Sequence, residues 1–311
     1  MIAVSDTGRG WWIGVDLGGT WVRVTARDGR GRRRAFKGRA PRLAELPAFL
    51  HRLWRRWKFT RSGVSALVVA SRGVWTAGER RTQQRRLRGL AASVRVVSDA
   101  EAAYHGALGE GAGVLVLAGT GSMALARDAR GRWARAGGLG PLLGDEGSAF
   151  WIGREWLRAS LAGSGRGAEI EAARRLLRSP DPVAAIAARA PGVLRRARAG
   201  AGRARALVAR AQDALAELIL SAARDLPPRA PTAVSWAGSL LGDARFRAGI
   251  WRAARRRGLA VLPAAPRETA VTAAARMAAT LGRPDAGRPD GGRASGGGEP
   301  HRRAPRSRHS R

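Results

Sequence analysis

Residues 11–24, WWIGVDLGGTWVRV, place a short Asp-Leu-Gly-Gly-Thr turn between two apolar segments. Alternating apolar residues on both sides of a glycine turn are typical of two antiparallel strands joined as a hairpin. Glycines after a strand often approach a phosphate closely, but no lysine and no GKS or GKT ending follows this turn. The stretch therefore predicts a hairpin whose turn would hold an anion without a lysine.

The same plan returns later in the chain. Residues 13–32, IGVDLGGTWVRVTARDGRGR, and residues 114–132, VLVLAGTGSMALARDARGR, each run from an apolar strand through a Gly/Thr turn into a second strand, and then into Ala-Arg-Asp and Gly-Arg. An ordinary hairpin turn is the alternative explanation of DLGGT taken alone. The pair predicts a duplicated domain in which each half opens with its own glycine turn.

Two facing glycine turns would clamp a triphosphate from both sides. Backbone N–H groups approach phosphate oxygens closely where no side chain intrudes, and hydroxyl groups add further donors. Asp16 would repel a phosphate directly, but it suits a water-mediated Mg²⁺ position, because Mg²⁺ keeps several waters and takes few carboxylates. The predicted phosphate-binding residues are Gly18, Gly19, Thr20, Gly119, Thr120, Gly121 and Ser122.

The rest of the chain predicts further strands and helices. Apolar runs predict buried strands at 64–71, 94–97 and 232–237, and helical spacing predicts helices at 43–57, 100–111, 203–226 and 268–281. The tail from Gly282 to Arg311 is rich in Gly, Pro and Arg and has no apolar pattern. We expect this tail to be disordered.

The composition limits the class of protein. A chain of 311 residues with 45% hydrophobic residues has the length for two globular domains. The absence of cysteine excludes a disulfide framework, a thiolate zinc site and a cysteine-held iron–sulfur cluster. No apolar run is long enough to span a bilayer, and the chain does not open with a secretory signal, so we expect a cytoplasmic protein without a membrane partner.

The formal net charge of +34 comes almost wholly from arginine. Only two of the 57 basic residues are lysines, and the chain has no asparagine. A concentrated basic stripe would indicate a nucleic-acid partner, but these arginines are scattered over nearly every segment. We therefore attribute the charge to compositional bias and expect no specific nucleic-acid partner.

Five segments, taken in order, resemble the N-acetylglucosamine kinase family within the BadF/BadG/BcrA/BcrD ATPase group of the actin–hexokinase–Hsp70 superfamily. They are VDLGGT (15–20), VSDAEAAYHGALG (97–109), LAGTGS (117–122), GGLGPLLGDEGSAFWIG (137–153) and WAGSLL (236–241). The resemblance covers residues 11 to about 281. It implies an α/β fold of two ribonuclease-H-like, actin-like ATPase domains with a cleft between them, ATP with Mg²⁺, and transfer of a phosphoryl group to a sugar hydroxyl.

The resemblance also implies roles by position. Asp16 to Thr20 match the first phosphate loop, and Gly119 to Ser122 match the second. The adenosine-side turn corresponds to Gly238 and Ser239, and the sugar-side loop to Gly138, Leu139, Gly140 and Asp145. The expected organisation is an N-terminal domain over 1–98, closed by the 268–281 helix, a C-terminal domain over 99–267 and the tail over 282–311. An amino-sugar substrate is the expected ligand and a homodimer the expected assembly.

Asp99 is the candidate general base and substrate-binding carboxylate, because it stands at the end of VRVV, where α/β proteins place reactive groups. A sugar hydroxyl that attacks the γ-phosphate needs a carboxylate to orient it and accept its proton. The loose transition state of phosphoryl transfer does not require a strong base, so an ordinary carboxylate pKa suffices. The alternative is that Asp99 caps the following helix.

Asp145 and Glu146 precede the predicted helix SAFWIGREWLRASL, where a helix dipole tolerates negative charge. Capping of that helix is one explanation of the two acids. At Asp145 the other explanation is an acceptor for a sugar hydroxyl.

Several features depart from the family pattern. The chain has no asparagine to hold an acetamido group, Met123 follows the second glycine turn, and Arg72 and Trp75 occupy a loop that is usually smaller and more polar. The absence of cysteine argues against the cluster-bearing ATPases of this group and against the zinc motif of the ROK proteins. We expect an ATP-dependent kinase that acts on N-acetylglucosamine or glucosamine. A non-catalytic sugar or nucleotide sensor of the same fold is the open alternative.

Overall fold

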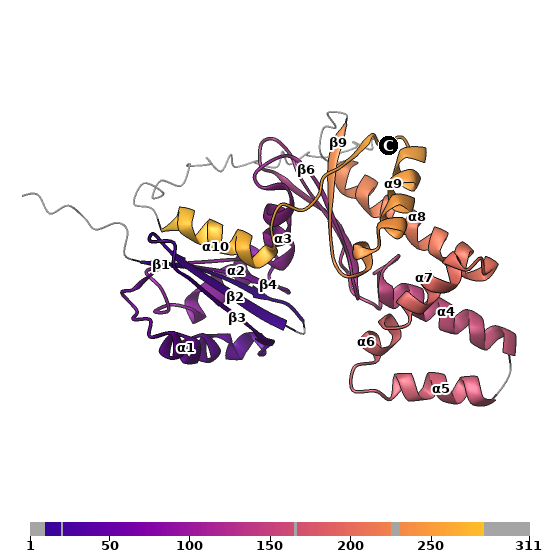
Figure 1. Cartoon of the computed structure of the whole chain (residues 1–311), viewed down its shortest axis with the longest axis horizontal. Coiled ribbons are helices and arrows are strands. Elements are labelled where there is room, and N and C mark those ends of the chain that lie inside the picture. The colour runs from indigo at the N-terminus through magenta and orange to yellow at the C-terminus, as the bar shows by residue number, and fades with distance from the viewer. Residues whose placement is uncertain (1–9, 20, 165–166, 225–230, 283–311) are drawn as a thin grey trace, which may run out of the picture.

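The computed structural model describes residues 10–19, 21–164, 167–224 and 231–282. These residues form two five-stranded sheets with helices packed around them (Figure 1). Thr20 and residues 283–311 of the predicted tail lie outside the described residues. Among the described residues, no helix combines the length and the apolar character that a bilayer span requires.

The first sheet carries the first glycine turn. Its strands are β1 (Trp11–Leu17), β2 (Trp21–Asp28), β3 (Arg33–Arg39), β4 (Val64–Ser71) and β5 (Ser93–Ser98), in the order β3-β2-β1-β4-β5. β1 pairs antiparallel with β2 and parallel with β4, and β4 pairs parallel with β5. The largely apolar sequence of β4 is buried along almost its whole length, as expected for a parallel strand that is covered on both faces. The predicted hairpin and both predicted strands in this half are confirmed.

The second sheet repeats this topology. Its strands are β6 (Gly113–Ala118), β7 (Ser122–Arg127), β8 (Trp133–Gly137), β9 (Thr232–Ala237) and β10 (Val261–Pro263), in the order β10-β9-β6-β7-β8. β6 pairs antiparallel with β7 and parallel with β9, and β9 pairs parallel with β10. Taken from the other edge, the order and strand directions are those of the first sheet, which confirms the predicted duplication.

The turn from β2 to β3 and the turn from β7 to β8 have the same hydrogen bonds. Oδ1 of Asp28 accepts the backbone N–H of Arg32 at 2.8 Å, and Oδ2 accepts its Nε at 2.6 Å. Asp128 and Arg132 make the same two bonds at the same distances. Desolvation disfavours both charged carboxylates, but the hydrogen bonds from the arginines outweigh it and lower the pKa of each aspartate. The repeated Ala-Arg-Asp and Gly-Arg segments thus close equivalent turns.

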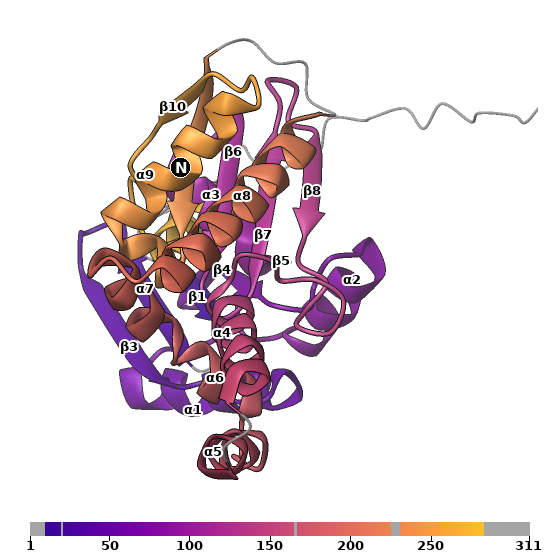
Figure 2. The same cartoon turned by 90° about the vertical axis from the view of Figure 1, so that its right-hand side faces the viewer.

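Helices connect the strands and cover the sheets. They are α1 (Leu46–Trp57), α2 (Ala77–Arg86), α3 (Asp99–Leu108), α4 (Ala149–Ser164), α5 (Gly167–Leu177), α6 (Pro182–Ala187), α7 (Ala190–Arg198), α8 (Gly202–Arg224), α9 (Ala244–Arg256) and α10 (Ala270–Leu281), with 3₁₀ turns η1 (Leu43–Glu45) and η2 (Leu240–Gly242). The helices α1, α3, α8 and α10 confirm the four predicted from spacing. Figure 1 shows α10 and α1 on opposite faces of the first sheet, and Figure 2 shows α8 and α9 in front of the second.

Two glycines permit close packing in the first half: Gly14 lets α10 lie against β1, and Gly106 lets α3 lie against the segment that leads into α10. A Cβ atom at Gly14 of β1 would lie 2.5 Å from the carbonyl oxygen of Val271 in α10. A Cβ atom at Gly106 of α3 would lie 2.8 Å from the carbonyl oxygen of Glu268, whose N–H donates to the carbonyl of Gly106 at 2.8 Å. Because α3 also contacts β6 and β9, this helix lies between the two sheets.

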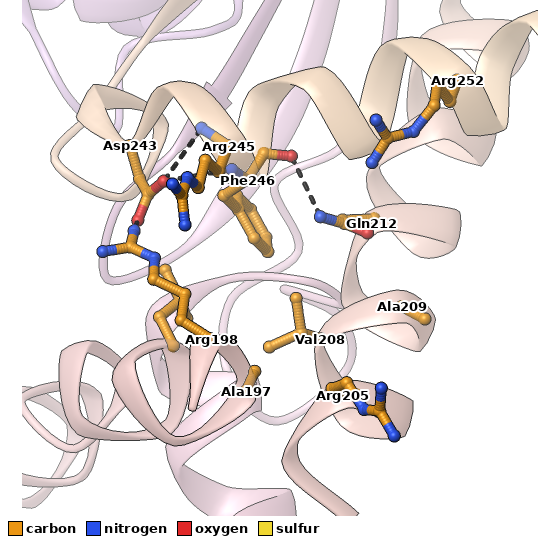
Figure 3. A pocket seen from close by; sticks show the side chains of 11 residues that line it. Ala197, Arg198, Arg205, Val208, Ala209, Gln212, Asp243, Arg245, Phe246 and Arg252 are labelled. Atoms are coloured by element: carbon orange, nitrogen blue, oxygen red, sulfur yellow. Dashed lines mark hydrogen bonds and ion pairs between the residues drawn. The ribbon is translucent and has the colours of Figure 1, made fainter. Parts of the chain in front are cut away.

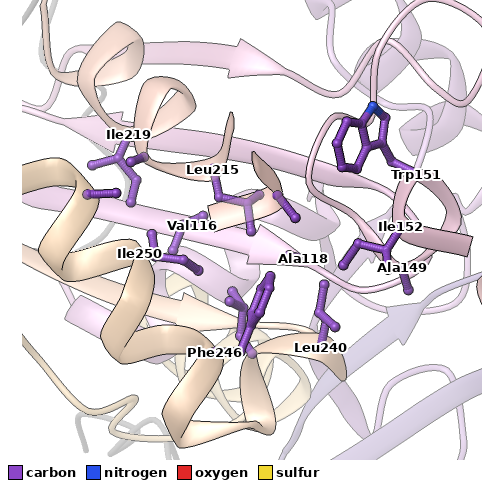
Figure 4. Close-up of a cluster of buried hydrophobic side chains, with 14 of the residues drawn as sticks. Val116, Ala118, Ala149, Trp151, Ile152, Leu215, Ile219, Leu240, Phe246 and Ile250 are labelled. Carbon is purple, nitrogen blue, oxygen red and sulfur yellow. The ribbon is translucent and has the colours of Figure 1, made fainter. Parts of the chain in front are cut away.

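A large apolar core supports the second sheet (Figure 4). It joins Val116 of β6 to Leu215 and Ile219 of α8 and to Phe246 and Ile250 of α9, all of them buried. Truncating a buried leucine to alanine typically costs about 2–5 kcal/mol. Because the same cluster includes side chains at the end of β6 and the start of α4, it holds in place the segments on either side of the second glycine turn.

Candidate active site

The first glycine turn joins β1 to β2. The N–H of Gly18 donates to the carbonyl oxygen of Trp21 at 3.0 Å, so the hairpin itself uses a donor that the sequence assigned to a phosphate. Oδ2 of Asp16 accepts Nη1 of Arg23 at 3.2 Å, and the Asp16 side chain is 15% exposed. Gly19 is exposed, and its N–H has no hydrogen-bond acceptor among the described residues. Thr20, a predicted donor, lies outside the described residues.

The second glycine turn lies between β6 and β7, and its carbonyl groups accept hydrogen bonds from the first turn of α4. The N–H of Ala149 donates to the carbonyl oxygen of Gly119 at 2.8 Å, and that of Phe150 to the carbonyl of Thr120 at 3.2 Å. In a planar trans peptide, the C=O group and the following N–H point in opposite directions. The N–H groups of Thr120 and Gly121 therefore point away from α4, and neither has an acceptor in the described part of the chain. Two such free backbone donors suit an anion.

Within the same turn, two of the predicted phosphate donors are already engaged. The N–H of Gly119 donates to the carbonyl oxygen of Gly121 at 3.0 Å. The hydroxyl of Ser122 donates to the carbonyl oxygen of Glu146 at 2.7 Å, and its N–H donates to Oδ1 of Asp145 at 3.0 Å. The hydroxyl that the sequence assigned to a phosphate thus joins the second glycine turn to the loop before α4.

The predicted adenosine-side turn lies against the second glycine turn. A Cβ atom at Gly119 would lie 3.6 Å from Oγ and 3.7 Å from N of Ser239. Gly238 has a φ of 102°, and a Cβ atom there would collide with the carbonyl oxygen of Ala118. Only glycine fits at this position, because both its backbone conformation and the close approach exclude a side chain.

Asp99 lies at the carboxyl end of β5, in the first turn of α3. Oγ of Ser98 accepts the N–H of Glu101 at 3.1 Å, and Oε2 of Glu101 accepts the N–H of Ser98 at 3.0 Å. This pair is a complete capping box, so Ser98 is the N-cap of α3 and the capping explanation of Asp99 is wrong. Oδ1 of Asp99 accepts only the N–H of the adjacent Ala100, at 2.9 Å, among the described residues.

Electrostatic interactions link Asp99 to the first glycine turn. Burial is the main cause that raises the pKa of Asp99, and the negative charge of Asp16 raises it further, while the N–H of Ala100 and the charge of Arg72 oppose the shift. Burial also raises the pKa of Asp16, against the opposing effect of Arg23. The structure therefore brings together Asp16, Asp99 and Arg72, and the Asp99 carboxylate is a better proton acceptor than an ordinary aspartate.

The predicted sugar-side loop follows β8. Gly138 and Gly140 have φ values of 73° and 82°, and Leu139 between them is 61% exposed. Asp145, from the end of this loop, extends beneath the second glycine turn, where a Cβ atom at Gly121 would lie 2.8 Å from either carboxylate oxygen. Burial is the main cause that raises the pKa of Asp145.

Helix α4 begins after this loop and has a different cap. The helix starts at Ala149, and Oγ of Ser148 accepts the N–H of Trp151 at 3.1 Å. Among the described residues, neither the Asp145 nor the Glu146 carboxylate accepts an N–H of α4, so the capping explanation of these two acids is wrong. Glu146 is exposed, whereas Asp145 is buried.

The sequence profile of the BadF/BadG/BcrA/BcrD ATPase family matches residues 13–275. The chain belongs to this family. A curated relative, the N-acetylmuramic acid/N-acetylglucosamine kinase of Clostridium acetobutylicum, is 32% identical over 162 residues, which cover 48% of this chain and 53% of the relative. The chain thus spans about half the length of the curated relative that it matches.

Two solved structures extend the likeness over most of the chain. A proposed N-acetylglucosamine kinase from Chromobacterium violaceum is 25% identical, with a TM-score of 0.66 over 88% of this chain and 99% of that one. Another from Porphyromonas gingivalis is 19% identical, with a TM-score of 0.60 over 85% and 97%. Together with the repeated sheet topology, these likenesses establish the two-domain α/β fold of actin-like ATPases and hexokinases.

Two contacts beside the site of this BadF/BadG/BcrA/BcrD family member were not identified from the sequence. The guanidinium of Arg135, on β8, lies 4.6 Å from the ring centroid of Trp75, which follows β4, and so joins the two halves. Nη2 of Arg80, on α2, lies 2.7 Å from Oε1 of Glu101 in the capping box of α3. Both contacts connect residues that are distant in the sequence, and no local pattern predicts them.

The residues present suit the ATP that membership of this ATPase family implies. The second glycine turn offers free N–H donors at Thr120 and Gly121, and the glycine at 238 keeps side chains away from it. Asp16 offers a carboxylate for Mg²⁺, which takes one or two carboxylates and completes its shell with water and phosphate oxygens. In the part of the chain that the structure describes, no cluster of three or more His, Cys, Asp or Glu side chains forms a metal cage.

A separate pocket of about 320 Å³ opens between α7, α8 and α9 (Figure 3). Asp243 forms an ion pair with Arg198 and caps α9 by accepting the N–H groups of Arg245 and Phe246, each at 3.1 Å. The residues that line this pocket are Leu194, Ala197, Arg198, Arg205, Val208, Ala209, Gln212, Asp243, Arg245, Phe246 and Arg252. None of the predicted site residues is among them, so the pocket is distinct from the glycine turns.

Proposed function

We propose that this protein is an ATP-dependent kinase that transfers the γ-phosphoryl group to a hydroxyl of an amino sugar, N-acetylglucosamine or glucosamine. The observation that carries the proposal is the position of Asp99. Its carboxylate is free of the capping role, which Ser98 performs, and lies close enough to Asp16 for the charges to interact. A proton acceptor therefore lies beside the first glycine turn.

The relatives support the class of acceptor. The curated relative is named a kinase of N-acetylmuramic acid and N-acetylglucosamine, and both similar structures are proposed N-acetylglucosamine kinases. This chain has no asparagine, so backbone groups of the loop from Gly138 to Gly140 and the buried Asp145 are the proposed contacts to the sugar. Gly138 and Leu139 are exposed and Gly140 is partly exposed, which supports that assignment.

In the proposed reaction, the hydroxyl oxygen of the sugar forms a bond to the γ-phosphorus, and the bond from that phosphorus to the β–γ bridging oxygen breaks. Asp99 accepts the hydroxyl proton, and ADP leaves. The N–H groups of Thr120 and Gly121 would bind phosphate oxygens of the nucleotide, and Asp16 would hold Mg²⁺ through water. Mg²⁺, when bound, neutralises negative charge on the phosphates.

A coupled assay of ADP formation with a panel of amino sugars tests this function. We expect sugar-dependent ADP formation that Asp99→Asn abolishes nearly completely. Asp181→Asn is the matched control, because Asp181 caps α6 by accepting the N–H of Ala184 at 2.9 Å and plays no part in the site. Binding of ADP and sugar without ADP formation would instead identify the protein as a sensor.

A further inference from the structure

Arg72 lies between the first glycine turn and Asp99. A Cβ atom at Gly19 would lie 2.8 Å from Nη1 and 3.4 Å from Cζ of Arg72, so the guanidinium contacts the backbone of the turn. The N–H of Arg72 approaches the carbonyl oxygen of Leu17 at 3.5 Å, and its carbonyl oxygen accepts the hydroxyl of Ser71 at 3.1 Å. These bonds hold the backbone of Arg72 at the end of β1, beside the turn.

In the part of the chain that the structure describes, the guanidinium of Arg72 has no ion-pair partner, unlike those of the neighbouring arginines. Arg23 binds Asp16 at 3.2 Å, and Arg80 binds Glu101 at 2.7 Å. Arg72 is exposed, and its side chain makes no hydrogen bond or ion pair within the described ranges of the chain, although its charge acts on Asp99. All five N–H donors of this guanidinium are therefore available to a ligand.

We infer that Arg72 is a catalytic residue that binds the transferred γ-phosphoryl group and stabilises its charge in the transition state. The inference rests on the proposed kinase function. The reacting phosphorus must lie between the turn that holds the phosphates and the carboxylate that takes the sugar proton. The Arg72 guanidinium contacts Gly19 and its charge acts on Asp99, so it can reach the reacting phosphorus.

The charges of the site explain why a cation is needed there. Asp16 and Asp99 face a triphosphate that is itself negative, and the first glycine turn contains no lysine. A guanidinium is always charged, and its planar donors match two phosphate oxygens at once. Arginines that contact the transferred group of other phosphoryl-transfer enzymes contribute about 10³–10⁵-fold to turnover.

Kinetics of Arg72→Ala and Arg72→Lys with neutral and acidic amino sugars test the inference. We expect Arg72→Ala to lower kcat by roughly 10³-fold with every acceptor, with ADP affinity unchanged. Arg72→Lys should recover part of the loss, because lysine keeps the charge but not the paired donors. Arg81→Ala, an exposed arginine of α2, should behave as the unmodified protein does. An unchanged kcat in Arg72→Ala, or a loss confined to acceptors that carry a carboxylate, would overturn the inference.

Binding measurements separate this inference from the proposed function. Calorimetry with ADP and with a non-hydrolysable ATP analogue reports the γ-phosphoryl contact without any turnover. Arg72→Ala should weaken binding of the analogue and leave ADP binding intact, even if no sugar in the panel is phosphorylated. Equal affinity of the variant and the unmodified protein for the analogue would exclude the contact, whatever the acceptor of the reaction is.

Discussion

Asp145 and Ser122 meet beneath the second glycine turn, where Oδ1 of Asp145 accepts the N–H of Ser122 at 3.0 Å. Asp145 is 7% exposed, and its φ of 63° lies in a region that few residues other than glycine adopt. Such a conformation persists only where the surrounding structure enforces it. The sugar-side loop and the second glycine turn are thus joined through one buried carboxylate.

Asp145→Ala should lower the free energy of unfolding by roughly 1–3 kcal/mol, because the buried N–H of Ser122 loses its acceptor. Asp145→Gly loses the same acceptor but suits the positive φ, so its destabilisation should be smaller. Asp145→Asn keeps a carbonyl oxygen for Ser122 and should remain close to the unmodified protein. Urea unfolding measures all three variants. Equal stabilities of the Ala and Asn variants would show that the contact contributes nothing.

Asp99→Asn should reduce turnover by about 10²–10⁴-fold, because the amide cannot accept the hydroxyl proton. Ser98→Ala provides the contrasting variant, since Ser98 caps α3. It should lose about 1 kcal/mol of stability and retain its turnover. Steady-state kinetics and thermal unfolding of both variants check these outcomes. Normal turnover in Asp99→Asn would exclude Asp99 as the general base.

The rate should fall on the acid side as Asp99 becomes protonated, at a pH above the ordinary value of 3.8 for an aspartate. Asp16→Asn should shift this acid limb to lower pH, because it removes a like charge from the vicinity of Asp99. Arg72→Ala should shift it to higher pH, because it removes an opposite charge. The pH dependence of kcat/KM measures both shifts. If the acid limb moved in the same direction in Asp16→Asn and in Arg72→Ala, the electrostatic interaction among these residues would be contradicted.

The raised pKa of Asp99 also makes a prediction about stability. A raised folded-state pKa contributes stability that is fully present below the unfolded value of 3.8 and is lost as the pH rises through the folded value. At neutral pH, the desolvated Asp99 carboxylate therefore lowers the free energy of unfolding of the unmodified protein. Asp99→Asn should raise Tm at pH 7, and this gain should shrink as the pH approaches 4. A gain that is independent of pH would exclude ionisation as its source.

Gly238→Ala should destabilise the protein by roughly 1–3 kcal/mol, because the added Cβ enforces a strained φ and collides with the backbone before the second glycine turn. Displacement of that turn should also reduce the rise in Tm that ADP produces. Gly242→Ala is the matched control, because a Cβ atom at Gly242 meets no atom within 4 Å. If both variants lose the same stability, the close packing at Gly238 has no special importance.

Local patterns in the sequence predicted most of the regular elements near the site. β1, β2, β4, β5, β6, β7 and β9 coincide with apolar runs, and α8 coincides with a stripe of apolar residues at helical spacing. Such signals lie within a few residues of one another, so the sequence displays them directly. The edge strand β3 has no fully buried residue, and Phe36 is its one partly buried apolar side chain that packs against the core. A single apolar contact does not produce an alternating pattern that the sequence would display.

Helix caps were harder to assign, because each helix start offers more than one polar residue. Ser98 and Asp99 are adjacent before α3, and Asp145 and Ser148 both precede α4. In each case the serine caps the helix, and the aspartate is directed elsewhere. Residue type alone permits either choice, and the backbone conformation at the start of the helix decides between them.

The sequence by itself determined the duplicated hairpins, the two glycine turns and the family of the protein, because each depends on a run of neighbouring residues. Only the tertiary structure decided that Arg72 contacts Gly19, that Asp16 acts on Asp99 and that Asp145 binds Ser122. Each of these pairs joins segments that are far apart along the chain and adjacent only after the strands have paired and the helices have packed. Distances and burial set their electrostatic interactions, and neither quantity is encoded in any local pattern of residues.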